Sequence, residues 1–289
     1  MRTDMAGRRV LITGAARGIG AALARRLHER GARLALVGLE PDELAKVAID
    51  CGDAPWRECD VSDAAALSAA VDELAQQLGG LDVVVANAGI ARQWSLLHGD
   101  PAILATTLRV NTMGVCHTIQ AATRHVNHPG GYLLVVSSLA AAVHLPLLGA
   151  YSASKAAAEA LGDTARIELR PSGARVGVAY FAELDTDMTA RGFDTDASRA
   201  FFGPSGVRGG VTPLSVAIDK VESGIARRAT RICVPRWVRP VLWARIPAQF
   251  AIGLRSRGRK LHEMLKIART EEVPFTTEQP EQPERPARD

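Results

Sequence analysis

One segment near the start of the chain limits the fold more than any other: an apolar run that leads into a glycine-rich turn and then a helical pattern. The run is RVLITG, glycine recurs at positions 14, 18 and 20, and the helical pattern IGAALARRLHERG ends at Gly31. Glycines let the backbone turn tightly and approach a pyrophosphate, while the helix N-terminus offers free N–H groups to an anion. The spacing G-x-x-x-G-x-G differs from the usual G-x-G-x-x-G. The segment favours dinucleotide binding, with a plain strand-to-helix connection as the alternative.

Further short apolar runs alternate with longer segments of helical periodicity. The expected strands are RLALVG, WRECDV, LDVVVANAG, YLLVVSS, RVGVAYF and residues 231–235. Helices are expected between them, among others around residues 101–125 and 152–169. Because the strand runs lack polar alternation, they are typical of a parallel sheet buried on both faces. We therefore expect a doubly wound α/β domain over residues 1–235.

Composition excludes several classes of protein. The 289-residue chain is 47% hydrophobic, but no run approaches the roughly 18 to 20 apolar residues that a spanning helix needs. The first apolar run is too short for a signal-peptide core, so we expect a cytoplasmic protein. A net charge of only +4 argues against nucleic-acid binding. Widely spaced cysteines without histidines at zinc-ligand spacing predict reduced thiols and no metal site. They are Cys51, Cys59, Cys116 and Cys233.

Two segments after the sixth expected strand interrupt the alternation. Residues 189–212 are rich in glycine, charge and aromatics, which favours a long substrate loop over a disordered connection. Residues 271–289 are rich in proline, glutamate and glutamine, and we expect this tail to be disordered.

The extension at residues 236–270 mixes aromatic, aliphatic and basic side chains. It carries Arg236, Arg239, Arg245, Arg255, Arg257, Arg259, Lys260, Lys266 and Arg269 against Glu263 as its one acid. Such a composition suits a surface helix on an anionic membrane interface. Because Pro240 and Pro247 interrupt a long amphipathic helix, packing against the same subunit or a neighbour is the favoured interpretation, with peripheral membrane contact as the alternative.

Tyr151 and Lys155 stand one helical turn apart in YSASKAAAEAL. Residues i and i+4 share one face of a helix, so the lysine can act on the phenol. An unperturbed tyrosine titrates near about pH 10, and a neighbouring ammonium favours the phenolate. The pair therefore indicates acid/base chemistry, whereas an ordinary alanine-rich helix start is the alternative.

Several motifs together resemble the short-chain dehydrogenase/reductase (SDR) family over about residues 7–235. In chain order they are Thr13-Gly14-x-x-x-Gly18-Ile19-Gly20, Asp60-Val61, Asn87-Ala88-Gly89, Asn111, Ser138 and Tyr151-x-x-x-Lys155. The resemblance implies a Rossmann-type doubly wound parallel sheet of about seven strands with helices on both faces. It also implies an NAD(P)-dependent oxidoreductase acting on CH–OH groups. A non-catalytic dinucleotide-binding regulatory or assembly protein on the same fold is the alternative.

The resemblance assigns four catalytic residues. Tyr151 would be the acid/base, because the cofactor moves only the hydride and a proton must reach the substrate oxygen. Lys155 would lower the tyrosine pKa and hydrogen-bond the nicotinamide ribose. Ser138 would bind the substrate oxygen, with Ser137 as a less well spaced alternative. Asn111 would hold a water behind Lys155, or it would bridge a neighbouring backbone.

The resemblance also implies the cofactor contacts. They are Gly14, Arg17, Gly18, Ile19, Gly20, Glu40, Asp60, Val61, Asn87, Ala88, Gly89, Tyr151, Lys155 and Thr186. Glu40 could reach the ribose hydroxyls, or it simply opens a helix before Pro41. Arg17 could meet a 2′-phosphate, but Gly38 and Leu39 supply no second cation, so NAD is slightly favoured over NADP. The family's usual Pro-Gly before the threonine is absent, since Phe181 and Ala182 follow the sixth strand.

The substrate pocket is expected to be apolar. By their place in the fold its candidates are Leu139, Ala142, His144, Leu145, Phe181, Phe193, Phe201 and Phe202. A polyhydroxylated substrate would need many polar partners, so apolar walls indicate a hydrophobic alcohol or ketone. For His144, a lone surface histidine is the simpler interpretation. The resemblance further implies a homo-oligomer, either a dimer or a tetramer.

Overall fold

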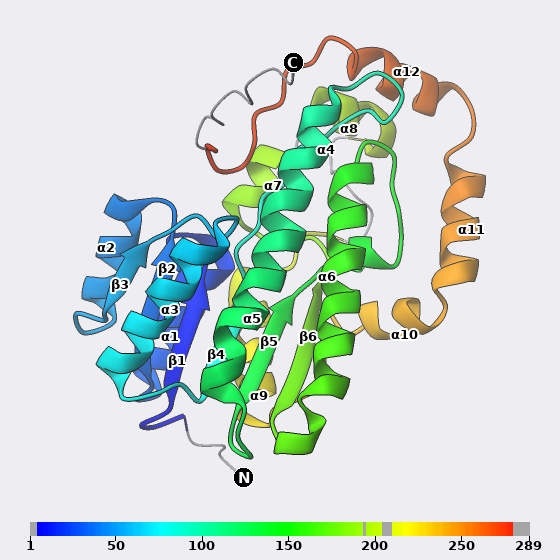
Figure 1. Ribbon diagram of the computed structural model, residues 1–289. Helices are drawn as coiled ribbons and strands as arrows, with labels where there is room; N and C mark the ends of the chain where they lie inside the picture. The colour runs from blue at the N-terminus through cyan, green and yellow to red at the C-terminus, as the bar shows by residue number, and fades with distance from the viewer. Residues whose placement is uncertain (1–4, 193–194, 204–209, 280–289) are drawn as a thin grey trace, which may run out of the picture.

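Seven parallel strands form a single sheet in the computed structural model, which describes residues 5–192, 195–203 and 210–279 (Figure 1). The strand order is β3-β2-β1-β4-β5-β6-β7. The strands are β1 (Arg9–Thr13), β2 (Arg33–Gly38), β3 (Trp56–Glu58), β4 (Val83–Ala86), β5 (Tyr132–Val136), β6 (Arg175–Phe181) and β7 (Arg231–Val234). The order reverses between β1 and β4, and ligands of open α/β sheets bind at the carboxyl end of such a switch point.

Helices cover both faces of the sheet, as the sequence predicts. The first seven are α1 (Gly18–Glu29), α2 (Pro41–Asp50), α3 (Ala64–Leu78), α4 (Pro101–Leu108), α5 (Gly114–Val126), α6 (Gly149–Glu168) and α7 (Asp187–Gly192). The others are α8 (Asp196–Phe202), α9 (Leu214–Ala226), α10 (Val238–Trp243), α11 (Arg245–Arg255) and α12 (Arg259–Ile267). Apolar side chains of α1, α2 and α9 pack on one face, and those of α3, α5 and α6 pack on the other. The doubly wound parallel sheet is thereby confirmed.

Helix boundaries follow local capping chemistry. Asp63 begins α3 by accepting hydrogen bonds from two backbone N–H groups of its first turn, at 3.0 Å each, and Gly79 ends it with a φ of +78°. Asp100 caps α4 in the same way, and Pro101 occupies its first position. The helix expected around residues 101–125 continues from α4 into α5 through a π-helical turn at Arg109–Met113.

The expected substrate loop contains two short helices. Residues 187–192 form α7 and residues 196–202 form α8, whereas the candidate Phe193 lies outside the described residues. Thr195 begins α8 by accepting a hydrogen bond from the Ser198 N–H at 3.1 Å. The described part of this segment is therefore largely helical, and its role as a substrate loop stays a prediction.

The C-terminal extension packs on its own chain. Val238 and Leu242 of α10 are buried with Tyr180 of β6, and Met264 of α12 is buried beside α8. This agrees with the packing interpretation for the inner side of residues 236–270. No helix within the described ranges is long and apolar enough to cross a membrane.

The tail differs from the expected disorder over residues 271–279. The Thr276 Oγ1 accepts a hydrogen bond from the Ala91 N–H at 3.1 Å, and the Thr276 N–H donates to the Ala91 carbonyl at 3.2 Å. The Arg92 guanidinium lies over the Phe275 ring, 5.3 Å from its centroid. Backbone pairing and a buried threonine hold this polar segment despite its low hydrophobicity. Residues 280–289 lie outside the described chain.

We predict that Gly177→Ala destabilises the sheet by about 2 kcal/mol or more, as overpacked cores do. A Cβ on Gly177 would lie 2.1 Å from the Tyr132 hydroxyl and 2.3 Å from the Ala229 carbonyl oxygen. It would therefore break the 2.7 Å hydrogen bond between those two groups. Urea unfolding measures the loss. Gly253→Ala in α11 is the control, since its Cβ meets nothing within 4 Å. Equal midpoints for the two variants would contradict the prediction.

Candidate active site

The glycine turn joins β1 to α1 through contacts that only glycine allows. A Cβ on Gly20 would lie 2.1 Å from the Gly14 carbonyl oxygen and 2.7 Å from Asn87 Nδ2, and Gly14 itself has a φ of +64°. Helix α1 begins after Arg17 without a side-chain cap and without an acidic residue in its first turn. Its N-terminus therefore presents backbone N–H groups and a positive dipole end, which fit the diphosphate of a dinucleotide.

The turn after β4 braces the glycine turn. Asn87 Nδ2 donates to the carbonyls of Thr13 and Gly14, both at 3.0 Å. In return the Thr13 hydroxyl accepts the N–H groups of Asn87 and Ala88 at 3.1 and 3.2 Å. Asn87, Ala88 and Gly89 line the cavity as expected, and the Asn87 side chain also has this structural task.

Arg17 and Glu40 meet at the end of the cavity that holds the glycine turn. Arg17 Nε lies 2.8 Å from Glu40 Oε1, and its Nη1 lies 4.0 Å from Asp187 Oδ2. Both members of the closer pair are partly buried, and all three residues line the cavity. The positive charge of Arg17 thus faces two carboxylates.

Ser138, Tyr151 and Lys155 converge at the carboxyl end of β5. The side chains of Ser138 and Tyr151 form a hydrogen bond, which opposes the effect of burial on the tyrosine. Burial dominates and raises the pKa of Tyr151 to about 12. Lys155 lies with its Nζ 5.7 Å from the Tyr151 ring centroid. Burial lowers the pKa of Lys155 to about 8, so the side chain is still mainly a cation at neutral pH.

Ser137 and Ser138 have different surroundings. The Ser137 hydroxyl donates to the Lys155 carbonyl at 2.9 Å inside the protein. Ser138 Oγ donates to the Phe181 carbonyl at 3.3 Å and accepts from the Ala140 N–H at 3.1 Å, beside Tyr151. Of the two serines, Ser138 is therefore the one whose hydroxyl lies beside the phenol.

Asn111 lies behind these residues in the π-helical turn. Its carboxamide accepts the Ile90 N–H and donates to the Ile90 carbonyl, both at 2.8 Å, and donates to Ser154 Oγ at 3.0 Å. The side chain is fully buried. It bridges a neighbouring backbone, which was one of the two interpretations of this residue, and its role with a water stays a prediction.

A cavity of about 980 Å³ connects the glycine turn with the Ser138–Tyr151–Lys155 group. Every expected cofactor residue except Gly20 lines it, as do Leu139, Leu145, Phe181, Phe201 and Phe202. Gly20, Asn111 and Ala142 do not line the cavity. His144 is exposed, and its backbone N–H donates to Gln249 Oε1 of α11 at 2.7 Å. This matches its interpretation as a surface histidine.

Thr186 lies after β6 at the edge of the cavity. Its hydroxyl accepts the Thr189 N–H at 3.4 Å, at the start of α7. Phe181 ends β6 almost fully buried and lines the cavity beside Ser138. The larger side chain in place of the family's usual proline therefore forms part of the wall.

Three further groups of residues line the cavity but were not predicted from the sequence. They are Gln93 with Ser198, the α11 residues Ala248, Ala251 and Ile252, and the tail residues Thr276, Thr277 and Gln279. Gln93 Nε2 donates to Ser198 Oγ at 2.7 Å, and the Thr195 hydroxyl donates to Gln93 Oε1 at 2.6 Å. Glu271 accepts the Asp196 N–H at 2.6 Å and so caps α8. These contacts join segments that are distant in sequence. No local sequence pattern predicts which residues will meet.

The fold and this cavity define a class: an α/β oxidoreductase with a dinucleotide site at the switch point of its sheet. The family model described as "short chain dehydrogenase" matches residues 8–197. The cis-4-hydroxycyclohexanecarboxylate dehydrogenase of Sinomonas cyclohexanicum is 38% identical over 195 residues, which cover 66% of this chain and 78% of that protein. The L-2,3-butanediol dehydrogenase of Corynebacterium glutamicum is 33% identical over 195 residues. The match covers 62% of this chain and 76% of that protein.

Solved structures agree with the fold. A short chain dehydrogenase from Burkholderia cenocepacia, crystallised in complex with NADP, matches with a TM-score of 0.74 and 24% identity, over 89% of this chain and all of that one. A short-chain type dehydrogenase/reductase from Mycobacterium marinum matches with a TM-score of 0.71 and 26% identity. The match covers 80% of this chain and 95% of that one. The chain belongs to the short-chain dehydrogenase/reductase family and is an NAD(P)-dependent oxidoreductase that acts on CH–OH groups.

Thr276→Val should loosen the tail from the cavity wall. The substitution leaves the buried Ala91 N–H without its acceptor, which costs about 1–3 kcal/mol. Hydrogen exchange should therefore accelerate at Ala91 and at residues 273–277. Thr277→Val is the matched control, because no hydrogen bond joins its hydroxyl to another described residue. Similar exchange in both variants would show that the Thr276 hydroxyl does not hold the tail.

Proposed function

We propose that the protein interconverts a hydrophobic secondary alcohol and its ketone, with Tyr151 as the acid/base. The observation that carries the proposal is the hydrogen bond between Ser138 and Tyr151 inside a cavity that also contains the buried Lys155 cation. A phenol, a hydroxyl and an ammonium can together hold an oxygen atom and exchange a proton with it.

Each side chain has a distinct task in the proposal. In the reductive direction the Tyr151 hydroxyl donates its proton to the ketone oxygen, and in the oxidative direction the phenolate accepts the alcohol proton. Ser138 Oγ donates a hydrogen bond to the same oxygen and stabilises the charge that develops there. Lys155 favours the phenolate over the phenol through its positive charge. Its Nζ also donates to the Val136 carbonyl at 3.1 Å, which limits its movement.

The cofactor would be held from the glycine turn to Lys155. NAD(P), when bound, supplies or accepts the hydride. The α1 N-terminus would take the diphosphate, Asp60 and Val61 the adenine, and Thr186 the carboxamide. Asn87, Ala88 and Gly89 would lie along the adenosine ribose. The uncapped α1 N-terminus and the lining positions of these residues support this assignment.

The substrate class follows from the walls near Ser138. Leu139, Val143, Leu145, Phe201 and Ile252 are apolar and line the same cavity as Ser138. Such walls favour hydrophobic groups around the reacting carbon. The names of the two relatives, which act on a hydroxycyclohexanecarboxylate and a butanediol, agree with a secondary alcohol.

We propose NAD as the preferred cofactor. A Glu40 carboxylate near the adenosine ribose can accept hydrogen bonds from its hydroxyls, and it would repel a 2′-phosphate. Arg17 could attract that phosphate, but it already lies beside Glu40 and Asp187. Assembly into a dimer or tetramer also remains a proposal, which the mass of the protein in solution would test.

Tyr151→Phe should lower kcat by about 10²–10⁴-fold, the usual contribution of a positioned acid/base. Cofactor affinity should change little, because the ring and Lys155 remain. Initial rates with a hydrophobic secondary alcohol and cofactor titration by fluorescence measure the two effects. Tyr132→Phe is the matched control: it also removes a buried hydroxyl, hydrogen-bonded to the Ala229 carbonyl, but outside the cavity.

The pH profile separates proton transfer from a packing effect in the same experiment. The raised pKa of Tyr151, about 12, keeps the phenol protonated at neutral pH, so alcohol oxidation in the wild type should rise from about pH 7 towards about pH 8. The rise should level off above the Lys155 pKa of about 8, because the ammonium that favours the phenolate is then lost. The Tyr151→Phe variant should lack this rise. Turnover near the wild-type level in that variant would refute Tyr151 as the acid/base.

Glu40→Gln should move cofactor preference towards NADP by roughly tenfold, which corresponds to removing about 1.4 kcal/mol of repulsion. The variant also leaves Arg17 without its closest carboxylate, while the more distant Asp187 and the charge of Glu43 remain. The ratio of kcat/KM for NADP and NAD measures the change. Glu29→Gln, the same substitution at an exposed position of α1 beside Arg26, should leave that ratio unchanged. A constant ratio in Glu40→Gln would argue against Glu40 as the ribose contact.

A further inference from the structure

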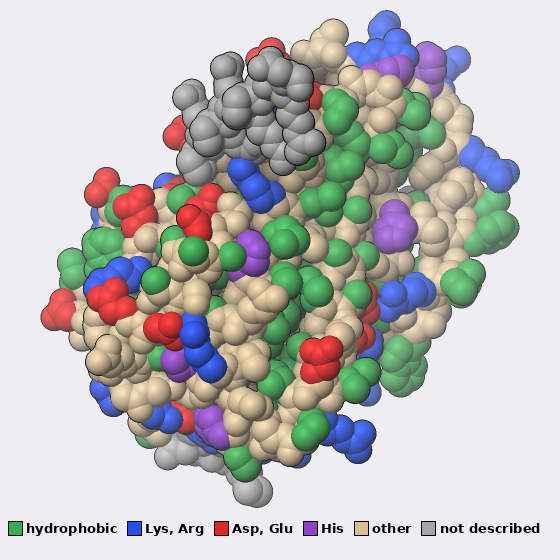
Figure 2. Space-filling model, viewed as in Figure 1, with side chains coloured by type: hydrophobic (Ala, Val, Ile, Leu, Met, Phe, Trp, Pro, Cys, Tyr) green, Lys and Arg blue, Asp and Glu red, His purple; other side chains and the backbone are tan. Residues whose placement is uncertain are grey.

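An exposed apolar stripe runs along α10 and α11. Its members, called here the α10–α11 patch, are Trp243, Ile246, Phe250 and Leu254, with exposed fractions of 75%, 81%, 67% and 45%. The three α11 members are spaced four residues apart and so share one face of the helix. Figure 2 shows apolar and basic side chains together at the edge of the molecule formed by these helices. Apolar patches of this kind on a protein surface mark interaction sites.

The opposite side of α11 packs on the protein. Ala248 and Ile252 contact the core cluster around Tyr180, and with Ala251 they line the cavity. No α11 residue is fully buried, so the helix covers the cavity as a single layer. One face of this layer lies on the active-site cavity and the other is exposed.

The charged side chains of the segment that carries the patch are all basic. No Asp or Glu occurs between Arg236 and Arg259. The Arg239 guanidinium lies over Trp243, 5.4 Å from the ring centroid. Among the described residues, no carboxylate forms an ion pair with Arg255, Arg257 or Lys260. Aromatic and aliphatic side chains bordered by unpaired cations complement an anionic lipid surface.

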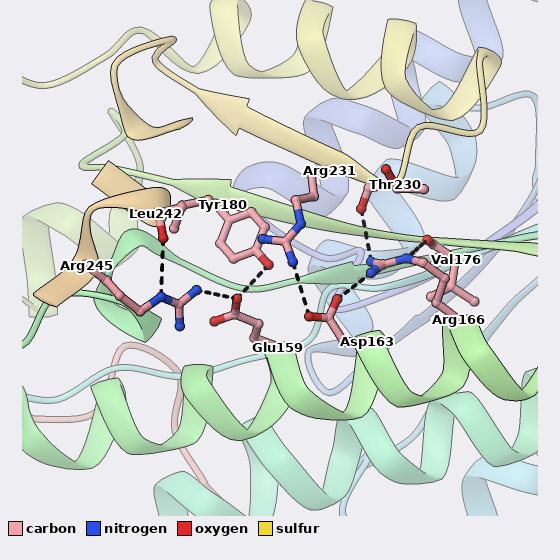
Figure 3. A network of polar contacts seen from close by, with 9 residues as sticks. All are labelled: Glu159, Asp163, Arg166, Val176, Tyr180, Thr230, Arg231, Leu242 and Arg245. Carbon is pink, nitrogen blue, oxygen red and sulfur yellow. Dashed lines mark hydrogen bonds and ion pairs between the residues drawn. The ribbon is translucent and has the colours of Figure 1, made fainter. Parts of the chain in front are cut away.

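Contacts with α6, the helix that carries Tyr151, hold the patch in its orientation. Arg245, at the start of α11, donates through Nη2 to Glu159 Oε1 at 2.9 Å (Figure 3). Glu159 is buried on α6, eight residues after Tyr151, and also accepts the Tyr180 hydroxyl at 3.0 Å. The neighbouring Asp163 pairs with Arg166 at 2.5 Å and with Arg231 at 3.3 Å. This network anchors α11 so that its apolar stripe faces outward.

We propose that the α10–α11 patch docks the protein on the interface of a bilayer that contains anionic lipid. Trp243, Ile246 and Phe250 would enter the headgroup region, and Arg239, Arg255 and Arg257 would contact lipid phosphates. A second copy of the chain fits less well, because a two-fold axis places a patch on itself and would bring like charges together. Docking also brings the part of the cavity wall that contains Arg255, Arg257, Arg259 and Lys260 close to the lipid phase, where hydrophobic alcohols partition.

The test is cosedimentation of the full chain with phosphatidylcholine vesicles, with or without phosphatidylglycerol. The wild type should pellet only with the anionic vesicles, and added salt should weaken the binding because it screens the arginines. Trp243→Ser with Phe250→Ser should reduce binding at least tenfold. Ile49→Ser is the matched control, since Ile49 on α2 has the same 67% exposure as Phe250.

Other outcomes overturn the proposal. They are equal pelleting of the double variant and the wild type, or no pelleting of the wild type with anionic vesicles. If size-exclusion chromatography without lipid shows a wild-type dimer that the double variant loses, the patch is an interface between copies. Turnover of a short water-soluble alcohol in lipid-free buffer should be the same in the double variant and the wild type, which tests the oxidoreductase proposal separately.

Discussion

The carboxamide of Asn111 is the contact on which the geometry of the site most depends. With two 2.8 Å hydrogen bonds it holds the Ile90 backbone after β4, and with a third it reaches Ser154 on α6. Ser154 in turn donates to the Tyr151 carbonyl at 2.7 Å. One fully buried side chain thereby sets the distance between the cofactor side of the cavity and the helix that carries Tyr151 and Lys155. The π-helical turn positions this carboxamide between the two.

The same arrangement explains why the site tolerates two buried titratable groups. Lys155 and Tyr151 are only 3% and 8% exposed, and burial disfavours the charged form of each. At neutral pH the Tyr151 phenol is neutral, so the pair buries only one charge, the Lys155 ammonium. This cation donates a hydrogen bond to the Val136 carbonyl. Gly89 lies against this cation: a Cβ there would be 3.3 Å from Lys155 Nζ and 3.2 Å from Asn111 Oδ1. The absence of a side chain at Gly89 is part of how the pair is accommodated.

The sheet and the lining residues could be predicted from sequence because their signals are local. Unbroken apolar runs mark strands buried on both faces, and Tyr151 with Lys155 repeats at helical spacing. The walls made by α11 and residues 276–279 depend on long-range contacts. Arg245 reaches Glu159 and Thr276 reaches Ala91, and nothing near either residue in the sequence identifies its partner. The low hydrophobicity of the tail therefore predicted disorder. In the structure the Thr276 hydroxyl and backbone N–H bind the Ala91 backbone and hold residues 271–279 in place.

The pairing of Thr276 with Ala91 also bears on when the site becomes complete. The two residues are 185 positions apart. At about 5–20 residues per second, the ribosome makes Thr276 about 10 to 40 s after Ala91, so the sheet can form around an unfinished cavity during that interval. The last wall of the cavity is then added to a preformed scaffold, so the lining of the cavity is complete only at this late step of biosynthesis.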